Sequence, residues 1–209
     1  MNRFLLGFVA ALGLSLAVYS IQPLPAMAAN ASLEDATKDM VEGKADAPVT
    51  MIEYASLGCP HCANFHFNTY PQIKKNYVDT GKVKMIFRDF PLGTPALAAS
   101  MIARCAGSQR YFGMVEIFFR SQKQWGSAEN PLEALKKTAR FGGMSGQDVD
   151  ACLQNQALLT HIRDKAADGQ KKYDVNATPS FVIDGKTISG GMPYKDFKVY
   201  LDMALEKAE

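Results

Sequence analysis

Residues 49–62 read VTMIEYASLGCPHC. The first part, residues 49–55, is rich in β-branched and aromatic residues and almost continuously apolar, which is typical of a buried central strand. Pro60 is well suited to the first turn of a helix. The stretch therefore predicts a buried strand that leads into a helix, with Cys59 and Cys62 at the junction.

The segments on either side of this stretch extend the pattern. A weak helical stretch is expected over residues 33–41. After the first strand, a helix is expected to run to about residue 80, with a kink or interruption at Pro71. Residues 83–90 read as a second strand that stops before Pro91. Strand, helix and strand predict a parallel βαβ unit.

The second half combines a helical block with an antiparallel end. Residues 95–173 have apolar residues at helical spacing almost throughout. Two short strands, 180–183 and 186–189, flank Asp184-Gly185, a dipeptide that favours a two-residue hairpin turn. A terminal amphipathic helix follows. We predict an α/β fold with a mixed sheet, helices on both faces and a large helical insertion.

The first 28 residues have the features of a signal peptide. Arg3 supplies a basic start, an apolar run reaches Ile21, and Ala26-Met27-Ala28 has the small-x-small pattern of a cleavage site. Cleavage there would leave residues 29–209 as one domain with a sizeable core. The competing interpretation is an uncleaved anchor, because the run approaches the ~20 residues that span a bilayer. The prolines after the run and the Ala-x-Ala site favour cleavage.

The charge balance and the cysteine content limit the partners and the disulfides that can be expected. The chain has 23 Lys and Arg against 21 Asp and Glu, so nothing suggests nucleic acid or an acidic membrane surface as a partner. Disulfides form and persist in exported proteins, and four cysteines permit three pairings. Spacing must decide among these pairings.

The Cys59-Pro60-His61-Cys62 motif has the parts that thiol–disulfide exchange requires: an attacking thiolate and a second thiol that resolves the mixed disulfide. Cys59 is expected at the helix start, where unpaired N–H groups and the helix dipole favour a negative charge. His61 can donate a hydrogen bond or place a positive charge beside this sulfur, and Pro60 fixes the turn. A stabilised thiolate stabilises the reduced form, so we expect an oxidant.

Other roles for this motif fit less well. A static disulfide would gain little from closing so short a loop. A structural zinc site wants four ligands, and with His66 as a third ligand the remaining cysteines, Cys105 and Cys152, stand far away in the sequence. Haem attachment requires a histidine directly after the second cysteine, where Ala63 stands. We therefore expect neither a metal nor another cofactor.

Far downstream, Thr178-Pro179 precedes a predicted strand, where proline is tolerated because it begins the strand. Together with the strand, the Cys-Pro-His-Cys centre and the helical block, this pair makes the chain resemble the DsbA family of exported thiol–disulfide oxidoreductases, over about residues 48–205. The resemblance implies a thioredoxin-like fold, Cys59 as the attacking thiol, Thr178-Pro179 as a cis-proline substrate loop and Glu53 as a buried acid beneath the site.

The resemblance also implies partners and a location. Reduced, unfolded exported proteins would be the substrates, and a membrane quinone-linked enzyme would reoxidise the centre. The protein would be a periplasmic monomer. A disulfide isomerase or reductase remains an alternative, although only about 20 residues lie between Ala28 and Val49, too few for the dimerisation domain that related isomerases carry. A non-enzymatic zinc- or peptide-binding module is a third hypothesis.

Three further features have two interpretations each. Glu53 on an apolar strand either exchanges a proton with Cys62, its pKa raised by desolvation, or faces solvent at the strand end. Cys105 and Cys152 either form a structural disulfide, contributing roughly 4 kcal/mol at most, or remain buried thiols. The aromatic residues of the insertion belong either to the core or to the rim of a shallow peptide groove; they are Phe112, Phe118, Phe119 and Trp125.

Overall fold

The computed structural model describes residues 30–208. Its five-stranded sheet has the order β1-β3-β2-β4-β5. The strands are β1 (Met40–Glu42), β2 (Val49–Ala55), β3 (Val83–Asp89), β4 (Ser180–Ile183) and β5 (Lys186–Ser189). β2 runs parallel to β3, whereas the other neighbouring pairs are antiparallel. The sheet is therefore mixed, as predicted, with β2 at its centre.

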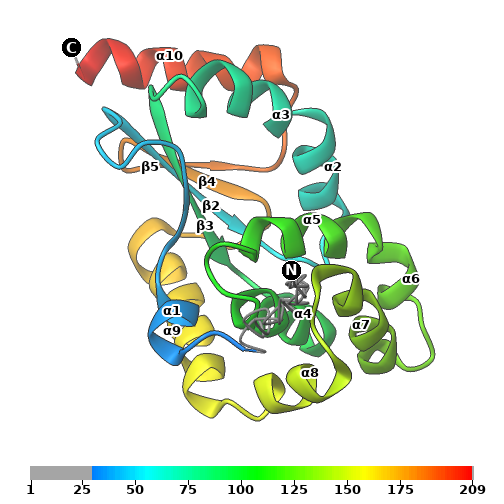
Figure 1. The fold of residues 1–209 in the computed structure, drawn as a ribbon. Helices are drawn as coiled ribbons and strands as arrows, with labels where there is room; N and C mark the ends of the chain where they lie inside the picture. The colour runs from blue at the N-terminus through cyan, green and yellow to red at the C-terminus, as the bar shows by residue number, and fades with distance from the viewer. Residues whose placement is uncertain (1–29, 209) are drawn as a thin grey trace, which may run out of the picture.

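Helices cover both faces of this sheet (Figure 1). α3 and α10 lie on one side, and α1, α4 and α9 lie on the other, where the helical block between β3 and β4 extends outward. The helices are α1 (Leu33–Thr37), α2 (Pro60–Asn68), α3 (Tyr70–Ile73), α4 (Thr94–Cys105), α5 (Tyr111–Arg120), α6 (Gln122–Gly126), α7 (Pro131–Ala139), α8 (Gly146–Leu153), α9 (Gln156–Tyr173) and α10 (Tyr194–Ala208). A π-helical turn, Lys74–Val78, follows α3, and a 3-10 turn, Arg140–Gly142, follows α7.

Local sequence signals explain several of these boundaries. The expected break near Pro71 lies at Thr69, between α2 and α3. Ser145 and Asp148 form a reciprocal capping box at the start of α8. Asp184 and Gly185 both have positive φ, 50° and 72°, as the two-residue turn between β4 and β5 requires.

The predicted helix over residues 33–41 is wrong in its second half. α1 ends at Thr37, and Met40–Glu42 instead pairs antiparallel with residues 85–87 of β3 as an edge strand. Met40 is 1% exposed, so this strand contributes a core side chain. The strand is only three residues long and its partner lies more than forty residues away, so no local periodicity marks it.

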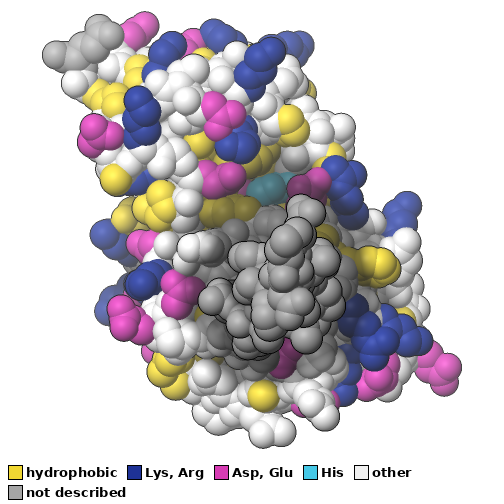
Figure 2. Space-filling model, viewed as in Figure 1, with side chains coloured by type: hydrophobic (Ala, Val, Ile, Leu, Met, Phe, Trp, Pro, Cys, Tyr) yellow, Lys and Arg dark blue, Asp and Glu magenta, His cyan; other side chains and the backbone are white. Residues whose placement is uncertain are grey.

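The predicted signal peptide, residues 1–28, lies outside the described residues. Within residues 30–208, no helix combines the length and the apolar character that crossing a membrane requires. Figure 2 shows Lys and Arg side chains interspersed with Asp and Glu side chains over the visible face. This mixture agrees with the nearly balanced charge of the sequence.

A buried ion pair joins the sheet to the helical block. Arg104 Nε on α4 donates to Asp89 Oδ2 at the end of β3 at 2.6 Å, and the two side chains are 4% and 1% exposed. The same guanidinium donates to the carbonyl oxygens of Ala36 and Lys38, and the Tyr111 hydroxyl donates to Asp89. The N-terminal segment, the sheet and the insertion therefore meet at one guanidinium.

Replacing Arg104 with methionine should lower the free energy of unfolding by about 3–5 kcal/mol, because it leaves a buried carboxylate without its cation. The matched control is Arg120→Met. Arg120 pairs with Glu116 in an exposed i,i+4 arrangement on α5, for which a loss below about 1 kcal/mol is expected. Urea unfolding of the oxidised proteins measures both values, and equal losses would contradict the structural role of the Asp89–Arg104 pair.

Candidate active site

Cys59 occupies the N-cap position of α2, immediately after the central strand. Pro60 is the first helical residue, and Cys62 lies in the first turn. This position exposes the sulfur of Cys59 to the unpaired backbone N–H groups and the positive end of the helix dipole. Cys59 and Cys62 are both thiols, and both are buried.

The surroundings of Cys59 favour its thiolate. Its pKa is lowered from 9.0 to about 5, chiefly by a hydrogen bond from the Cys62 thiol, against an opposing effect of burial. The Thr178 side chain and the backbone N–H groups of Cys62 and His61 lower the pKa further. The His61 side chain is exposed. Among these causes, His61 contributes through its backbone N–H.

Cys62 has the opposite environment. Its side chain is fully buried. Burial raises the pKa of its thiol well above the ordinary range, and the hydrogen bond to Cys59 and the negative charge of Glu53 raise it further. One sulfur of the pair is thus favoured as an anion, and the other is favoured as a neutral thiol.

Thr178 lies against the Cys59 sulfur, although it is more than one hundred residues away in the sequence. The peptide bond between Thr178 and Pro179 is cis. Cys59 Sγ donates to the carbonyl oxygen of Thr178 at 3.3 Å. The Thr178 hydroxyl is buried and has no hydrogen-bond partner among the described residues, so it is free to donate to a thiolate. The structure therefore brings the Cys59-Pro60-His61-Cys62 motif and the Thr178-Pro179 pair together.

Glu53 lies within β2, between Phe87 of β3 and Phe181 of β4 in the sheet register. It is fully buried, so it does not face solvent at a strand end. Both carboxylate oxygens contact Nε2 of His66, at 3.1 and 3.0 Å. This buried carboxyl is close enough to Cys62 to raise the pKa of its thiol, and it has a single titratable hydrogen-bond partner among the described residues.

Sequence reasoning missed two residues of this site. His66 follows Cys62 by four residues, which places both on one side of α2, but the sequence interpretation considered His66 only as a zinc ligand. Gln122 on α6 donates from Nε2 to the carbonyl oxygens of Leu57 and Cys59, at 2.7 and 3.1 Å. It thereby fastens the active-site turn to the insertion. No signal in the sequence indicated this contact, which spans more than sixty residues.

The remaining predicted residues lie in the helical block. A disulfide between Cys105 and Cys152 links α4 to α8, and both residues are buried. Phe118, Phe119 and Trp125 are buried core residues, and Phe112 and Phe119 also line a groove beside His66. Within residues 30–208, no three His, Cys, Asp or Glu side chains gather as metal ligands would.

Comparison with known proteins agrees with this geometry. The family model described as Thioredoxin matches residues 35–203. A Rickettsia conorii protein, provisionally named a protein-disulfide oxidoreductase, is 31% identical over 170 residues, which make up 81% of this chain and 61% of that protein. The chain therefore spans less than two thirds of the length of this relative.

Two solved structures are also similar. The crystal structure of Wolbachia pipientis alpha-DsbA1 is 31% identical with a TM-score of 0.75, covering 90% of this chain and 95% of that one. The crystal structure named protein-disulfide isomerase from Novosphingobium aromaticivorans is 26% identical with a TM-score of 0.69, covering 80% of this chain and 98% of that one.

The pKa of Cys59 makes the alkylation rate of the reduced protein depend on pH in a defined way. The rate should fall as pH decreases through about 5, because the thiolate is the reactive species. In Cys62→Ala the midpoint should move up but stay below 9.0, since the largest donor is lost and the backbone donors remain. Ultraviolet absorbance of the thiolate gives the same midpoints. A wild-type midpoint near 9.0 would contradict the assignment.

Proposed function

The chain belongs to the thioredoxin family, as a DsbA-like member, and we propose that it is a protein-disulfide oxidoreductase that donates its Cys59–Cys62 disulfide to reduced exported proteins. One observation carries the proposal: the Cys59 sulfur is favoured as an anion, with a pKa of about 5. Stabilising this thiolate stabilises the reduced protein, and the disulfide is correspondingly more oxidising.

The exchange follows from the two sulfur environments. A substrate thiolate attacks Cys59 Sγ, the Sγ–Sγ bond to Cys62 breaks, and its electron pair moves to Cys62, which takes up a proton. A second substrate thiolate then attacks the substrate sulfur of the mixed disulfide. Cys59 departs as a thiolate, and a thiol of low pKa is a good leaving group. The substrate loses two electrons and the protein gains two.

Further parts of the proposal rest on the surrounding residues. Thr178 and Pro179 would bind the substrate backbone beside Cys59, and the contact between the Thr178 carbonyl and the Cys59 sulfur supports this role. Glu53 would exchange the Cys62 proton. A membrane quinone-linked enzyme would reoxidise the centre, and the protein would act as a monomer. The signal-peptide pattern of residues 1–28 supports a periplasmic location, with residues 29–209 as the mature domain.

A second candidate activity is disulfide isomerisation. It is favoured by the name of the Novosphingobium aromaticivorans structure, to which this chain is similar over 80% of its length. Isomerisation uses the same attacking thiolate but leaves the number of substrate disulfides unchanged. A non-enzymatic peptide- or zinc-binding module is the third candidate, and it requires no exchange at Cys59.

An oxidation assay with reduced, unfolded ribonuclease A separates the three candidates. The oxidised protein should remove two substrate thiols per molecule, because one disulfide is transferred, and Cys59→Ala should remove none. The matched control removes the other cysteine pair, Cys105→Ala/Cys152→Ala, and should keep the exchange. Reshuffling of scrambled substrate without net oxidation would favour the isomerase, and an outcome independent of Cys59 would favour the binding module.

His61→Leu tests how the centre is tuned. The reduction potential of the Cys59–Cys62 pair should lie well above the −270 mV or so of thioredoxin. It should fall in His61→Leu, because leucine can neither donate a side-chain hydrogen bond nor place a positive charge beside the thiolate, as the imidazole can. The backbone N–H of residue 61 survives this substitution, so the pKa of Cys59 should stay below 9.0. Equilibration with glutathione measures the potential, and an unchanged value would show that the imidazole does not tune the centre.

A further inference from the structure

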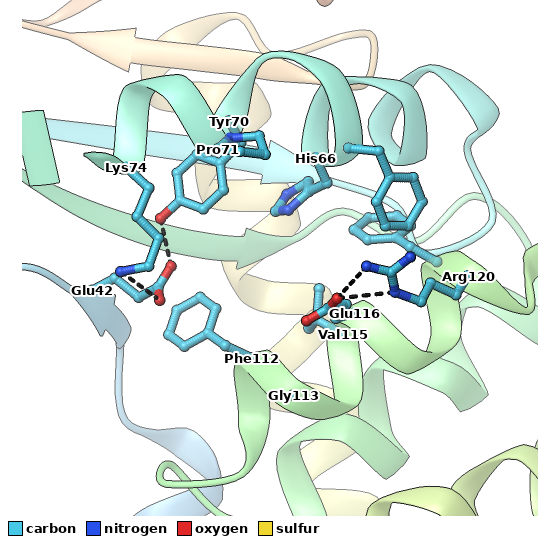
Figure 3. Close-up of a pocket in the computed structure, with 12 residues that line it drawn as sticks. Glu42, His66, Tyr70, Pro71, Lys74, Phe112, Gly113, Val115, Glu116 and Arg120 are labelled. Carbon is cyan, nitrogen blue, oxygen red and sulfur yellow. Dashed lines mark hydrogen bonds and ion pairs between the residues drawn. The ribbon is translucent and has the colours of Figure 1, made fainter. Parts of the chain in front are cut away.

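His66 connects a buried acid to the protein surface. Its Nε2 lies 3.1 and 3.0 Å from the two carboxylate oxygens of Glu53, which is fully buried. The His66 side chain is 10% exposed. It lines a groove of about 330 Å³ between the α2–α3 segment and α5, and Figure 3 shows its imidazole facing this groove.

We propose that His66 is a positioning residue that carries protons between this groove and Glu53, and so controls how fast Cys62 gains or loses its proton. The inference rests on the proposed function, because it concerns the proton that accompanies disulfide exchange. It adds a solvent-connected group to a carboxyl that has no exposure of its own.

The need for such a carrier follows from the burial of Cys62. When the disulfide opens, an electron pair arrives on a sulfur that is fully buried. Burial, the hydrogen bond to Cys59 and the charge of Glu53 all raise the pKa of Cys62. This sulfur therefore takes up a proton as it leaves Cys59.

The transfer balances in three moves. The Glu53 carboxyl gives its proton to Cys62 Sγ, which becomes a thiol, and a carboxylate remains. Protonated His66 gives the Nε2 proton to this carboxylate and becomes neutral. The proton that stays on Nδ1, the nitrogen that does not face Glu53, is the one that groove water supplied when the imidazole became charged, so the net transfer is one proton from water to Cys62. Reoxidation of Cys62 reverses each move.

The other titratable groups near this pair are poorly suited to the task. Burial raises the pKa of Tyr70 and that of Tyr111 far above neutrality, so neither phenol exchanges protons there. The acids and bases that line the groove are paired with one another, Glu42 with Lys74 and Glu116 with Arg120. The charged and titratable groups that contact the imidazole or line its groove are Glu53 on β2, Glu42 on β1, Tyr70 on α3, Lys74 in the π-helical turn, and Glu116 and Arg120 on α5.

Reduction of the Cys59–Cys62 disulfide by dithiothreitol tests the proposal. The rate constant is followed by stopped flow from about pH 5.5 to 8, the range in which histidine changes charge, and divided by the dithiothreitol thiolate concentration. For the wild type this normalised rate should decline as pH rises, because protonated His66 supplies the proton. His66→Gln should be slower at pH 7 by roughly tenfold or more, and its profile should be flat.

Two further variants separate proton transfer from packing. His66→Ala removes the ring beside the groove, and added imidazole should accelerate this variant but not the wild type. The matched control is His161→Gln, the same substitution on α9, where His161 has no contact with Glu53. It should keep the wild-type profile. A purely structural role of His66 predicts neither the imidazole rescue nor the flat profile.

The outcomes discriminate between this inference and the proposed function. A His66→Gln profile that matches His161→Gln would overturn the relay, as would failure of imidazole to accelerate a folded His66→Ala. If neither His66 variant folds by circular dichroism, the wild type decides, since a normalised rate that does not change with pH overturns the relay. Loss of Cys59-dependent exchange in the wild type would instead overturn the proposed function.

Discussion

In the reduced protein, the Cys59 sulfur accepts hydrogen bonds from the Cys62 thiol and from backbone N–H groups at the start of α2, and these contacts hold its pKa near 5. This arrangement requires a strand that ends and a helix that begins within the same few residues. β2 supplies this geometry because it is the central strand, held by β3 on one side and β4 on the other. The position of the reactive sulfur is therefore set by the core.

The same central position buries the partner sulfur and its neighbouring acid, and burial raises the pKa of the Cys62 thiol. Cys62 and Glu53 share the interior with the sheet, and neither has access to water. An electron pair can reach Cys62 easily only if a proton accompanies it. The two cysteines therefore have different forms in the reduced protein. Cys59 is favoured as a thiolate, and Cys62 is favoured as a neutral thiol.

Much of this organisation was predictable from local sequence. The apolar run before Cys59, the proline after it, the capping box at Ser145 and the Asp184-Gly185 turn each specify structure within a few residues. The contacts that were missed join distant segments. β1 depends on pairing with a strand more than forty residues later, and Gln122 reaches the active-site turn from another helix. Helical spacing indicated that His66 lies on the same side as Cys62, but it did not indicate which strand lies beneath.

Two buried acids in this molecule, Asp89 and Glu53, have partners of different kinds. The partner of Asp89 suits a structural role, whereas the partner of Glu53 suits a role in proton transfer. Asp89 is paired with Arg104, whose guanidinium does not lose its proton in proteins, so the charge there is permanent and holds three segments together. Glu53 is paired with a histidine, a residue type that gains and loses a proton readily, and the ring of this histidine borders a groove. A fixed cation suits a joint that must not change during turnover. A titratable partner suits an acid that passes a proton on, as we propose for Glu53.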